Sequence, residues 1–188
     1  MTQIQNLSIL SWNSRSLYSN LAEFKIYLYV NKPHLACICE TWLKESREPC
    51  FVGYSPYFKH RTDRLGGGLL ILVRNDLCVI EKQLNIFQNG NLEIQAVSLY
   101  GKEKIDVFNL YNPSRPVTKE EFMFYFNQLN TNSIVVGDFN GHHILWDQKT
   151  SPNRTGNNLV EALIAFNNLE LLTPVNSPTY CNVHTNTT

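Results

Sequence analysis

The sequence has no excess of charge of either sign, because its 16 lysine and arginine residues equal its 16 aspartate and glutamate residues in number. Strong non-specific DNA binders usually carry a basic surplus, so contact with nucleic acid has to come from a local patch. The chain also lacks long apolar runs. Its longest aliphatic stretch, residues 69–73, is far too short to cross a bilayer, so we expect no membrane partner.

The sequence also lacks a cysteine pattern, because its five cysteines are odd in number and do not match the spacing of a zinc site. Cys37 and Cys39 lie two apart in an apolar run, which indicates small buried side chains in a reducing compartment. The N-terminus has no basic start followed by an apolar stretch, so no signal peptide is indicated. We therefore predict an intracellular protein, in the nucleus or the cytoplasm.

What the chain does contain is typical of one globular domain. Hydrophobic residues make up 43% of it and aromatic residues 12%, in a length that can bury a sizeable core. Apolar runs predict strands at residues 7–12, 34–39, 69–73, 77–84, 92–99, 104–111 and 133–137, and a short one near residue 171. The four strands between 69 and 111 are separated by turn signals and indicate an antiparallel meander.

Apolar residues at helical spacing predict three helices. The first is capped by Ser16 and stopped by Pro33. The second begins with a capping box formed by Thr118 and Glu121, and the third contains Leu159. The order is strand, helix, strand, a run of strands, and then two helix–strand units. This order favours one α/β domain with two sheets packed face to face under helices.

Polar side chains stand at the ends of several predicted strands. The set comprises Asn13, Glu40, Tyr111, Asp138 and Asn140. Carboxylates and amide carbonyls are hard ligands that suit Mg²⁺, while amide N–H groups and a phenol can donate to phosphate oxygens. Each residue alone is more often a turn former or a solvated cap. Loops at strand ends are positioned by a rigid scaffold and often carry catalytic residues. Together, the five residues therefore indicate a Mg²⁺-dependent phosphoesterase.

Other common catalytic motifs are missing from the sequence. The Gly-Gly-Gly run at 66–68 lacks the Lys-Ser/Thr tail of a P-loop and does not open a helix. The chain has no Gly-x-Ser-x-Gly elbow, so nothing indicates a serine or cysteine nucleophile.

Five strings carry a resemblance to a known family. In chain order they are SWNSRSL, CICETWL, RLGGGLLILV, FNLYNPSRP and VVGDFNGHHILW. Together they resemble the endonuclease/exonuclease/phosphatase family, and within it the apurinic-type endonuclease domain of arthropod LINE-like, non-LTR retrotransposons. The resemblance implies one domain over residues 1–188. It implies a four-layer α/β sandwich, in which two mixed sheets are flanked by helices and the last strands are lacking.

The resemblance also implies a reaction and partners. The family nicks double-stranded target DNA with Mg²⁺, for which Mn²⁺ is an alternative, and leaves a 3′-hydroxyl that primes reverse transcription. A reverse transcriptase domain in the parent polyprotein is the second implied partner. Glu40 resembles the main metal carboxylate and Asn13 its neighbour. Tyr111 resembles the phenol that contacts the scissile phosphate. Asp138 resembles the acid that orients the attacking water, and Asn140 the amide that holds the phosphate.

The sequence departs from the family pattern in two places. Ser114 stands where the family often has asparagine. The chain also ends before the family's Ser-x-x-Asp strand and terminal Ser-Asp-His, whose histidine is the general base, and loss of a general base typically costs about 10²–10⁴-fold in rate. His142, His143 and His184 are expected to be surface or structural residues rather than its replacement. We therefore expect a marginally stable fragment or degraded copy, incomplete at its C-terminus.

DNA contacts are expected from a weak basic patch and from loops over the groove. The candidates are Trp42, Arg61, Arg64, Ser114 and His143. Two other functions stay open: a phosphatase of the same fold acting on a small phosphate ester, and a catalytically dead fragment that only binds metal or DNA. The GDFN-x-HH-x-x-W and ETWL strings favour the endonuclease over the phosphatase. Only an assay separates the endonuclease from the dead fragment.

Overall fold

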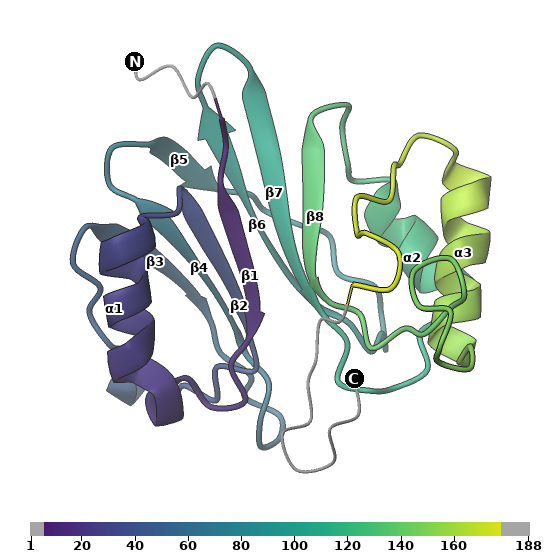
Figure 1. Cartoon of the computed structure of the whole chain (residues 1–188), viewed down its shortest axis with the longest axis horizontal. Coiled ribbons are helices and arrows are strands. Elements are labelled where there is room, and N and C mark those ends of the chain that lie inside the picture. Colours follow the sequence, from purple (N-terminus) through teal and green to yellow (C-terminus); the bar gives the residue numbers. More distant parts are fainter. Residues whose placement is uncertain (1–5, 178–188) are drawn as a thin grey trace.

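Two four-stranded β-sheets pack face to face in the computed structural model, which describes residues 6–177 (Figure 1). The first sheet has the order β1 (Ile9–Asn13), β2 (Leu35–Cys39), β4 (Leu69–Arg74) and β3 (Tyr54–Lys59). Strands β1 and β2 run parallel, whereas β4 is antiparallel to both of its neighbours. Every residue of β2 is buried because this strand is covered on both faces, which explains its unbroken apolar sequence.

The second sheet has the order β5 (Cys78–Glu81), β6 (Glu93–Tyr100), β7 (Lys104–Tyr111) and β8 (Ser133–Asp138). Strands β5, β6 and β7 form an antiparallel meander, and β8 runs parallel to β7. Each sheet thus contains one parallel pair. The carboxyl ends of β1, β2, β7 and β8 are where the predicted site residues fall.

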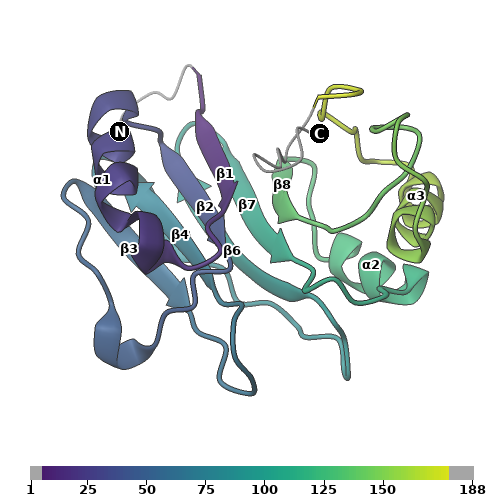
Figure 2. The ribbon, with the colours of Figure 1, turned by 60° about the horizontal axis from the view of Figure 1, so that its bottom comes forward.

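Helices cover the outer faces of both sheets and give the sandwich its four layers (Figures 1 and 2). A short 3-10 helix (Leu17–Asn20) leads into α1 (Leu21–Asn31), which lies on the first sheet, and a second 3-10 turn spans Glu45–Arg47. Helices α2 (Lys119–Phe126) and α3 (Arg154–Phe166) lie on the second sheet. No helix among residues 6–177 is long and apolar enough to span a bilayer.

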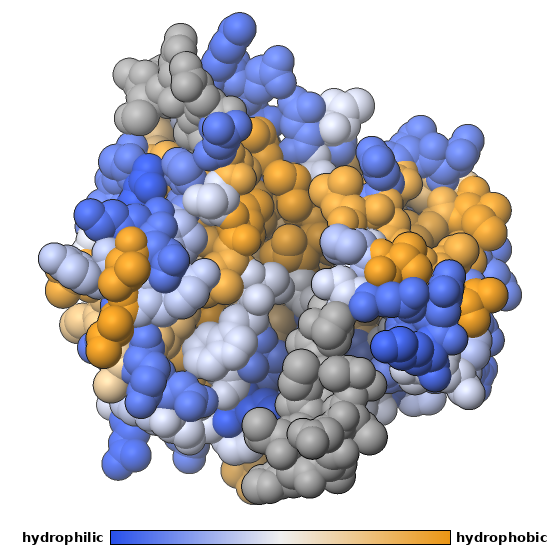
Figure 3. All heavy atoms as spheres, viewed as in Figure 1, coloured by the Kyte–Doolittle hydropathy of each residue, from blue (hydrophilic) through white to orange (hydrophobic). Residues whose placement is uncertain are grey.

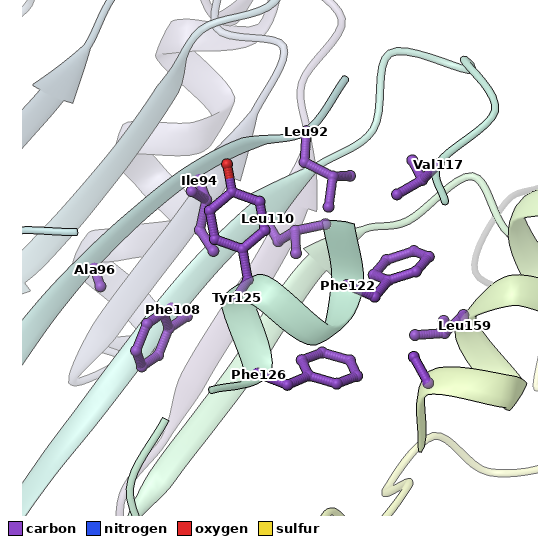
Figure 4. Close-up of a cluster of buried hydrophobic side chains, with 11 residues drawn as sticks. Leu92, Ile94, Ala96, Phe108, Leu110, Val117, Phe122, Tyr125, Phe126 and Leu159 are labelled. Carbon is purple, nitrogen blue, oxygen red and sulfur yellow. The ribbon is translucent and has the colours of Figure 1, made fainter. Parts of the chain in front are cut away.

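Three large buried clusters hold these layers together, beside a small one of Cys39, Leu69 and Tyr111. Phe24 and Leu28 of α1 pack on the first sheet, and Leu35, Val73 and Val97 belong to the cluster between the two sheets. The third cluster lies under α2 and α3, where Tyr125 of α2 points toward the sheet and Phe122 and Phe126 point toward α3 (Figure 4). Both thiols of β2, on Cys37 and Cys39, are buried and free, as predicted, and burial raises their pKa.

Polar bridges also join the two sheets inside the sandwich. The amide of Asn109, on β7, is fully buried and donates to the backbone oxygens of Ile38 at 3.0 Å and Leu70 at 3.4 Å. Lys59, on β3, donates through Nζ to the backbone oxygen of Ile94 at 2.8 Å. Because buried polar groups are costly unless they are paired, these contacts fix how one sheet sits on the other.

Strands β1 and β8 are edge strands that lie next to each other on one side of the molecule. Apolar surface gathers along this side in the space-filling view (Figure 3). Every residue of β8 is only partly buried, in contrast to β2. This side is therefore less completely covered than the interior of the first sheet.

One glycine is required by close packing within the second sheet. Gly137 of β8 has φ of 137° and pairs with Leu110 of β7. A Cβ atom at this position would overlap the backbone oxygen of Leu110. Only glycine therefore lets β8 approach β7 closely just before Asp138.

The structure corrects three predicted elements. The meander begins at β5 and not at residue 69, because β4 belongs to the other sheet and pairs there with β2 and β3. Strand β3 was not predicted, because its sequence contains Pro56 and has no clean alternation of apolar and polar residues. Proline is tolerated there because β3 is an edge strand. No strand forms near Leu171 in the part of the chain up to residue 177.

Of the two predicted helix caps, the structure lacks the first and contains the second only in part. Ser16 makes no side-chain cap and has φ of 85°; instead its backbone N–H donates to the backbone oxygen of Glu40 at 3.0 Å. Thr118 does cap α2, accepting from the backbone N–H of Glu121. The Glu121 carboxylate accepts from the backbone N–H groups of Asn91 and Leu92, each at 2.8 Å, and so holds a loop of the sheet.

Candidate active site

The amide of Asn13 joins two carboxylates that come from different sheets. Its Nδ2 donates to Oε1 of Glu40 at 2.8 Å and to Oδ2 of Asp138 at 2.8 Å. Asn13 is the last residue of β1, and Glu40 directly follows β2, the parallel neighbour of β1. Asp138 is the last residue of β8. The two sheets therefore present their carboxyl ends at the same edge of the sandwich, and three of the predicted residues meet there.

Backbone contacts hold Glu40 in a left-handed conformation with φ of 52°. Its backbone oxygen accepts from the hydroxyl of Ser14 and from the backbone N–H of Ser16, both at 3.0 Å. The following residues are tied to the glycine run, since the N–H groups of Thr41 and Trp42 donate to the backbone oxygens of Gly68 and Gly67. The turn after β2 thus has little freedom, and the direction of the carboxylate is fixed.

Left-handed backbone is concentrated in the loops around this edge. Positive φ angles occur at Arg15, Ser16, Glu40, Trp42, Ser114 and Asn140. Such conformations are costly for residues other than glycine and persist only where surrounding contacts determine them. The loops are therefore held in shape before any ligand arrives.

Tyr111 ends β7 and is buried beside the carboxylates. Burial raises the pKa of its phenol well above the ordinary value, and the neighbouring Glu40 carboxylate raises that pKa further. The guanidinium of Arg61 lies over the Tyr111 ring, 5.8 Å from its centroid. The phenol therefore stays protonated at neutral pH and can act only as a hydrogen-bond donor or as a neutral acceptor.

Asp138 and Asn140 are fixed by a buried residue that the sequence did not single out, Asn112. The backbone N–H of Asn112 donates to the backbone oxygen of Asp138 at 2.8 Å, and its side chain donates to the backbone oxygen of Phe139 at 2.9 Å. In return, Nδ2 of Asn140 donates to the backbone oxygen of Asn112 at 2.7 Å. The loops after β7 and β8 are thus locked together, and a polar residue between Tyr111 and a proline was the only local signal.

Asn153 is a second residue that the sequence did not single out. Its Oδ1 accepts from the N–H of Gly156 at 2.7 Å, which caps α3, and from the N–H of His142 at 3.1 Å. Its Nδ2 donates to the backbone oxygen of Asn140 at 3.0 Å. A cavity of about 350 Å³ opens next to this contact, and it is lined by Ser114, Arg115, Pro116, Asn140, His142, Asn153, Arg154 and Thr155.

The candidate DNA-binding residues fall into two groups by exposure. Trp42 is 50% exposed and Ser114 is exposed at the rim of the cavity, while the Arg64 side chain is 32% exposed. The Arg61 side chain, in contrast, is 8% exposed and forms an ion pair with Glu93.

The histidines of the GDFN-x-HH string lie beside the site without touching its carboxylates. Nδ1 of His143 accepts from the N–H of Leu145 at 3.2 Å, and its ring lies 5.4 Å from that of Trp146. No hydrogen bond between a histidine and Glu40 or Asp138 occurs within residues 6–177. His184 lies outside the described residues.

The donor set at this edge fits a hard divalent cation. Glu40 and Asp138 contribute carboxylate oxygens and Asn13 an amide, and Mg²⁺ is usually bound through one or two carboxylates with water and phosphate completing its shell. No group of three or more histidine, cysteine, aspartate or glutamate residues that could hold a metal occurs in the described part of the chain. Oxygen ligands of this kind suit a hard divalent cation better than zinc, which prefers nitrogen and sulfur ligands.

Known proteins with similar sequences are transposon polymerases. A family model described as Endonuclease-reverse transcriptase matches residues 105–188. The probable RNA-directed DNA polymerase from transposon BS of Drosophila melanogaster is 24% identical over 162 residues, covering 84% of this chain and 18% of that protein. The one from transposon X-element, also of Drosophila melanogaster, is 27% identical over 152 residues, covering 79% and 16%. The chain thus spans less than a fifth of these relatives.

Solved structures with a similar fold include two endonucleases. The endonuclease domain of TRAS1, a telomere-specific non-LTR retrotransposon, superposes with a TM-score of 0.74 at 19% identity, covering 93% of this chain and 78% of that one. An AP endonuclease from Archaeoglobus fulgidus superposes with a TM-score of 0.60 at 16% identity, covering 85% and 71%.

The fold and these matches define a class of similar proteins: the chain has the α/β sandwich fold of these endonucleases, and its residues 105–188 match the Endonuclease-reverse transcriptase model. More particularly, it is similar to the endonuclease domain of a non-LTR retrotransposon and to two transposon polymerases. The resemblance seen in the sequence strings is thereby confirmed, as is the predicted sandwich of two mixed sheets flanked by helices.

Proposed function

We propose that this domain nicks double-stranded DNA in a Mg²⁺-dependent reaction during retrotransposition. The observation that carries the proposal is the Asn13 bridge, which brings Glu40 and Asp138 together from two sheets at a rigid edge. The transposon relatives supply the context, since a nick leaves a 3′-hydroxyl from which a polymerase can copy RNA. A reverse transcriptase in the parent polyprotein and an intracellular location belong to the same proposal.

Each residue of the site has a separate task in this reaction. Glu40 and Asn13 would hold the metal ion, which when bound neutralises charge on the phosphate and the leaving oxygen. Asp138 orients a water molecule for in-line attack on phosphorus. The water oxygen forms a bond to phosphorus and gives up one proton to solvent, while the bond from phosphorus to the 3′ oxygen breaks. The 3′ oxygen takes up a proton from solvent to become the 3′-hydroxyl, and the phosphate stays on the 5′ side of the nick.

Two donors remain available for the phosphate. The Asn140 side-chain amide has two N–H groups, and one of them donates to the backbone oxygen of Asn112. The other N–H group can donate to a phosphate oxygen. Tyr111 stays protonated because its pKa is raised, and its hydroxyl can donate to the same group. Fixed donors of this kind stabilise charge that develops in the transition state.

The proposal is tested by nicking of supercoiled plasmid with Mg²⁺. We expect Glu40→Gln and Asp138→Asn each to lower the rate on the order of 10²–10⁴-fold, because the metal carboxylate or the water-orienting acid is lost. Glu103→Gln, an exposed acid at the other end of the second sheet, is the matched control and should leave the rate unchanged. Nicking that survives both site substitutions would falsify the assignment, and no nicking by the parent chain would favour a domain that only binds metal or DNA.

A further inference from the structure

The buried Arg61 belongs to a small cluster behind the proposed site, which we call the arginine clamp and which comprises Arg61, Glu93 and the glycines at 66–68. Arg61 forms an ion pair with one carboxylate oxygen of Glu93. The other oxygen accepts from the backbone N–H of Gly68 at 2.8 Å. Glu93 in turn lies directly opposite Tyr111 in the pairing of β6 with β7. One carboxylate therefore ties an arginine and a glycine loop to the strand beside Tyr111.

The glycine run makes room for this arrangement. All three glycines have positive φ, with values between 67° and 83°. A Cβ atom at Gly67 would overlap the guanidinium of Arg61. Gly67 thus leaves the space that Arg61 occupies, while a Cβ atom at Gly68 would meet the hydroxyl of Thr41 and one at Gly66 the indole of Trp42.

The clamp touches the proposed site from two sides. The Arg61 guanidinium faces the Tyr111 ring at 5.8 Å from the centroid. The backbone oxygens of Gly67 and Gly68 accept from Trp42 at 2.9 Å and Thr41 at 3.2 Å, which fixes the turn that carries Glu40. Tyr111 and Glu40 therefore share one support.

A buried ion pair at this place is not explained by stability alone. Taking two charges out of water is expensive, and hydrophobic replacements of such pairs are often neutral or stabilising. At 8% exposure, Arg61 also has little surface left for a DNA phosphate, whereas the nearby Arg64 side chain is 32% exposed.

We propose that Arg61 is a positioning residue that sets the place of Tyr111 and Glu40, and that DNA is contacted by Arg64 instead. The proposal rests on the function proposed above. In the folded protein without DNA, the Tyr111 ring is expected to lose its fixed environment when the clamp is removed.

The test compares Arg61→Lys and the double substitution Arg61→Met with Glu93→Gln against Arg64→Gln and Arg74→Gln. Lysine keeps the charge but has no planar guanidinium to lie on a ring. The double variant removes both buried charges and keeps an acceptor for Gly68, so it avoids an unpaired charge. Arg74 is ion-paired with Asp76 at the far end of β4 and serves as the matched arginine control.

Three measurements separate the possible roles. The ¹⁹F resonance of residue 111 is read in protein that carries 3-fluorotyrosine, and it is assigned by its loss in Tyr111→Phe. DNA affinity is measured as a function of salt, because a lost phosphate contact lowers the slope of log K against log salt by about one. The kcat and KM of plasmid nicking complete the set.

We expect both Arg61 variants to shift the ¹⁹F resonance and to lower kcat on the order of 10²-fold, with the salt slope unchanged. Arg64→Gln should lower the salt slope by about one and leave the resonance in place. Arg74→Gln should change none of the three measurements.

The inference is overturned if either Arg61 variant folds with an unchanged resonance, or if its salt slope falls as that of Arg64→Gln does. Should the double variant fail to fold, Arg61→Lys decides alone. If the parent chain does not nick DNA, the proposed function fails, while the resonance still supports or overturns the positioning role.

Discussion

The acidic side chains at the two ends of the sandwich differ in how completely they are paired with donors from the chain. Near the start of β7, Asp106 is fully buried and accepts from Lys82 at 2.6 Å, Ser98 at 2.6 Å and Asn130 at 2.7 Å, with Lys104 3.6 Å away. At the other end, Glu40 and Asp138 share the Asn13 amide, and Asp138 accepts one further hydrogen bond, from the backbone N–H of Asn140 at 3.0 Å. No salt bridge among the described residues involves either carboxylate.

This difference separates an acid that holds the fold from acids kept available for chemistry. Every oxygen of Asp106 is occupied by a donor from the chain, so nothing further can bind to it. The carboxylates at the other end keep free lone pairs that a cation or a water molecule can use. Charge alone therefore does not identify the site; incomplete pairing at a rigid edge does.

The largest effect is expected when the paired acid is removed. Asp106→Ala leaves Lys82 beside a buried gap without its partner, and loss of one partner of a buried pair typically costs about 3–5 kcal/mol. Because Lys82 keeps 21% of its surface, we expect the lower end of that range, about 3 kcal/mol, in a urea melt. Nicking per folded molecule should stay the same, and a change in kcat would break the comparison between the two ends.

The same acid predicts how stability depends on pH. Burial alone raises the pKa of Asp106, but hydrogen bonds from Lys82 and Ser98 outweigh it, so the pKa lies below its ordinary value of 3.8. Its contribution is therefore present above that value and is lost as the pH falls through the lowered pKa. Melts recorded between neutral and strongly acidic pH should show this loss in the parent and not in Asp106→Asn.

Two asparagines provide a matched test, because each donates to a carboxylate at one end. Asn13→Ala should lower the nicking rate on the order of 10²–10³-fold with little change in stability, since Glu40 and Asp138 lose their shared donor. Asn130→Ala should do the reverse, costing about 1 kcal/mol of stability while kcat is kept. Similar kcat values for the two variants would contradict the assignment.

The smallest chemical changes, each the addition of one methyl group, are made at two glycines. Gly137→Ala should destabilise the protein by about 2–3 kcal/mol, since its Cβ atom would overlap the Leu110 backbone. At Gly101 a Cβ atom meets only the backbone oxygen of Glu103 at 3.7 Å, so Gly101→Ala should stay within about 0.5 kcal/mol of the parent. Equal melting temperatures for the two variants would show that β8 can move away from β7.

Local patterns were sufficient to predict most of the fold. Buried strands such as β2 and β8 are visible as apolar runs, and α3 follows from helical spacing with its apolar residues on one side. Strand β3 was not visible because it is an edge strand with a proline and no clean alternation. The assignment of β4 to the first sheet was equally hidden, since a turn signal does not reveal which sheet the next strand joins.

Only part of the candidate site could be predicted, for a related reason. Asn13, Glu40 and Asp138 stand at strand ends and do come together. Asn112 and Asn153 act through hydrogen bonds to residues 11 to 28 positions away. Such bonds cannot be predicted from the spacing of neighbouring residues. The buried position of Arg61 was invisible for the same reason, because only the folded sheet places Glu93 beside it.

The Asn13–Asp138 hydrogen bond spans 125 positions of the chain, which has a consequence for the order of folding. Contacts of such long sequence separation form late, because closing the intervening chain has to be compensated by other contacts first. Neither sheet alone contains the complete set of residues. A partly folded chain on the ribosome therefore holds no assembled site, and the proposed nicking activity would appear only once both sheets have docked.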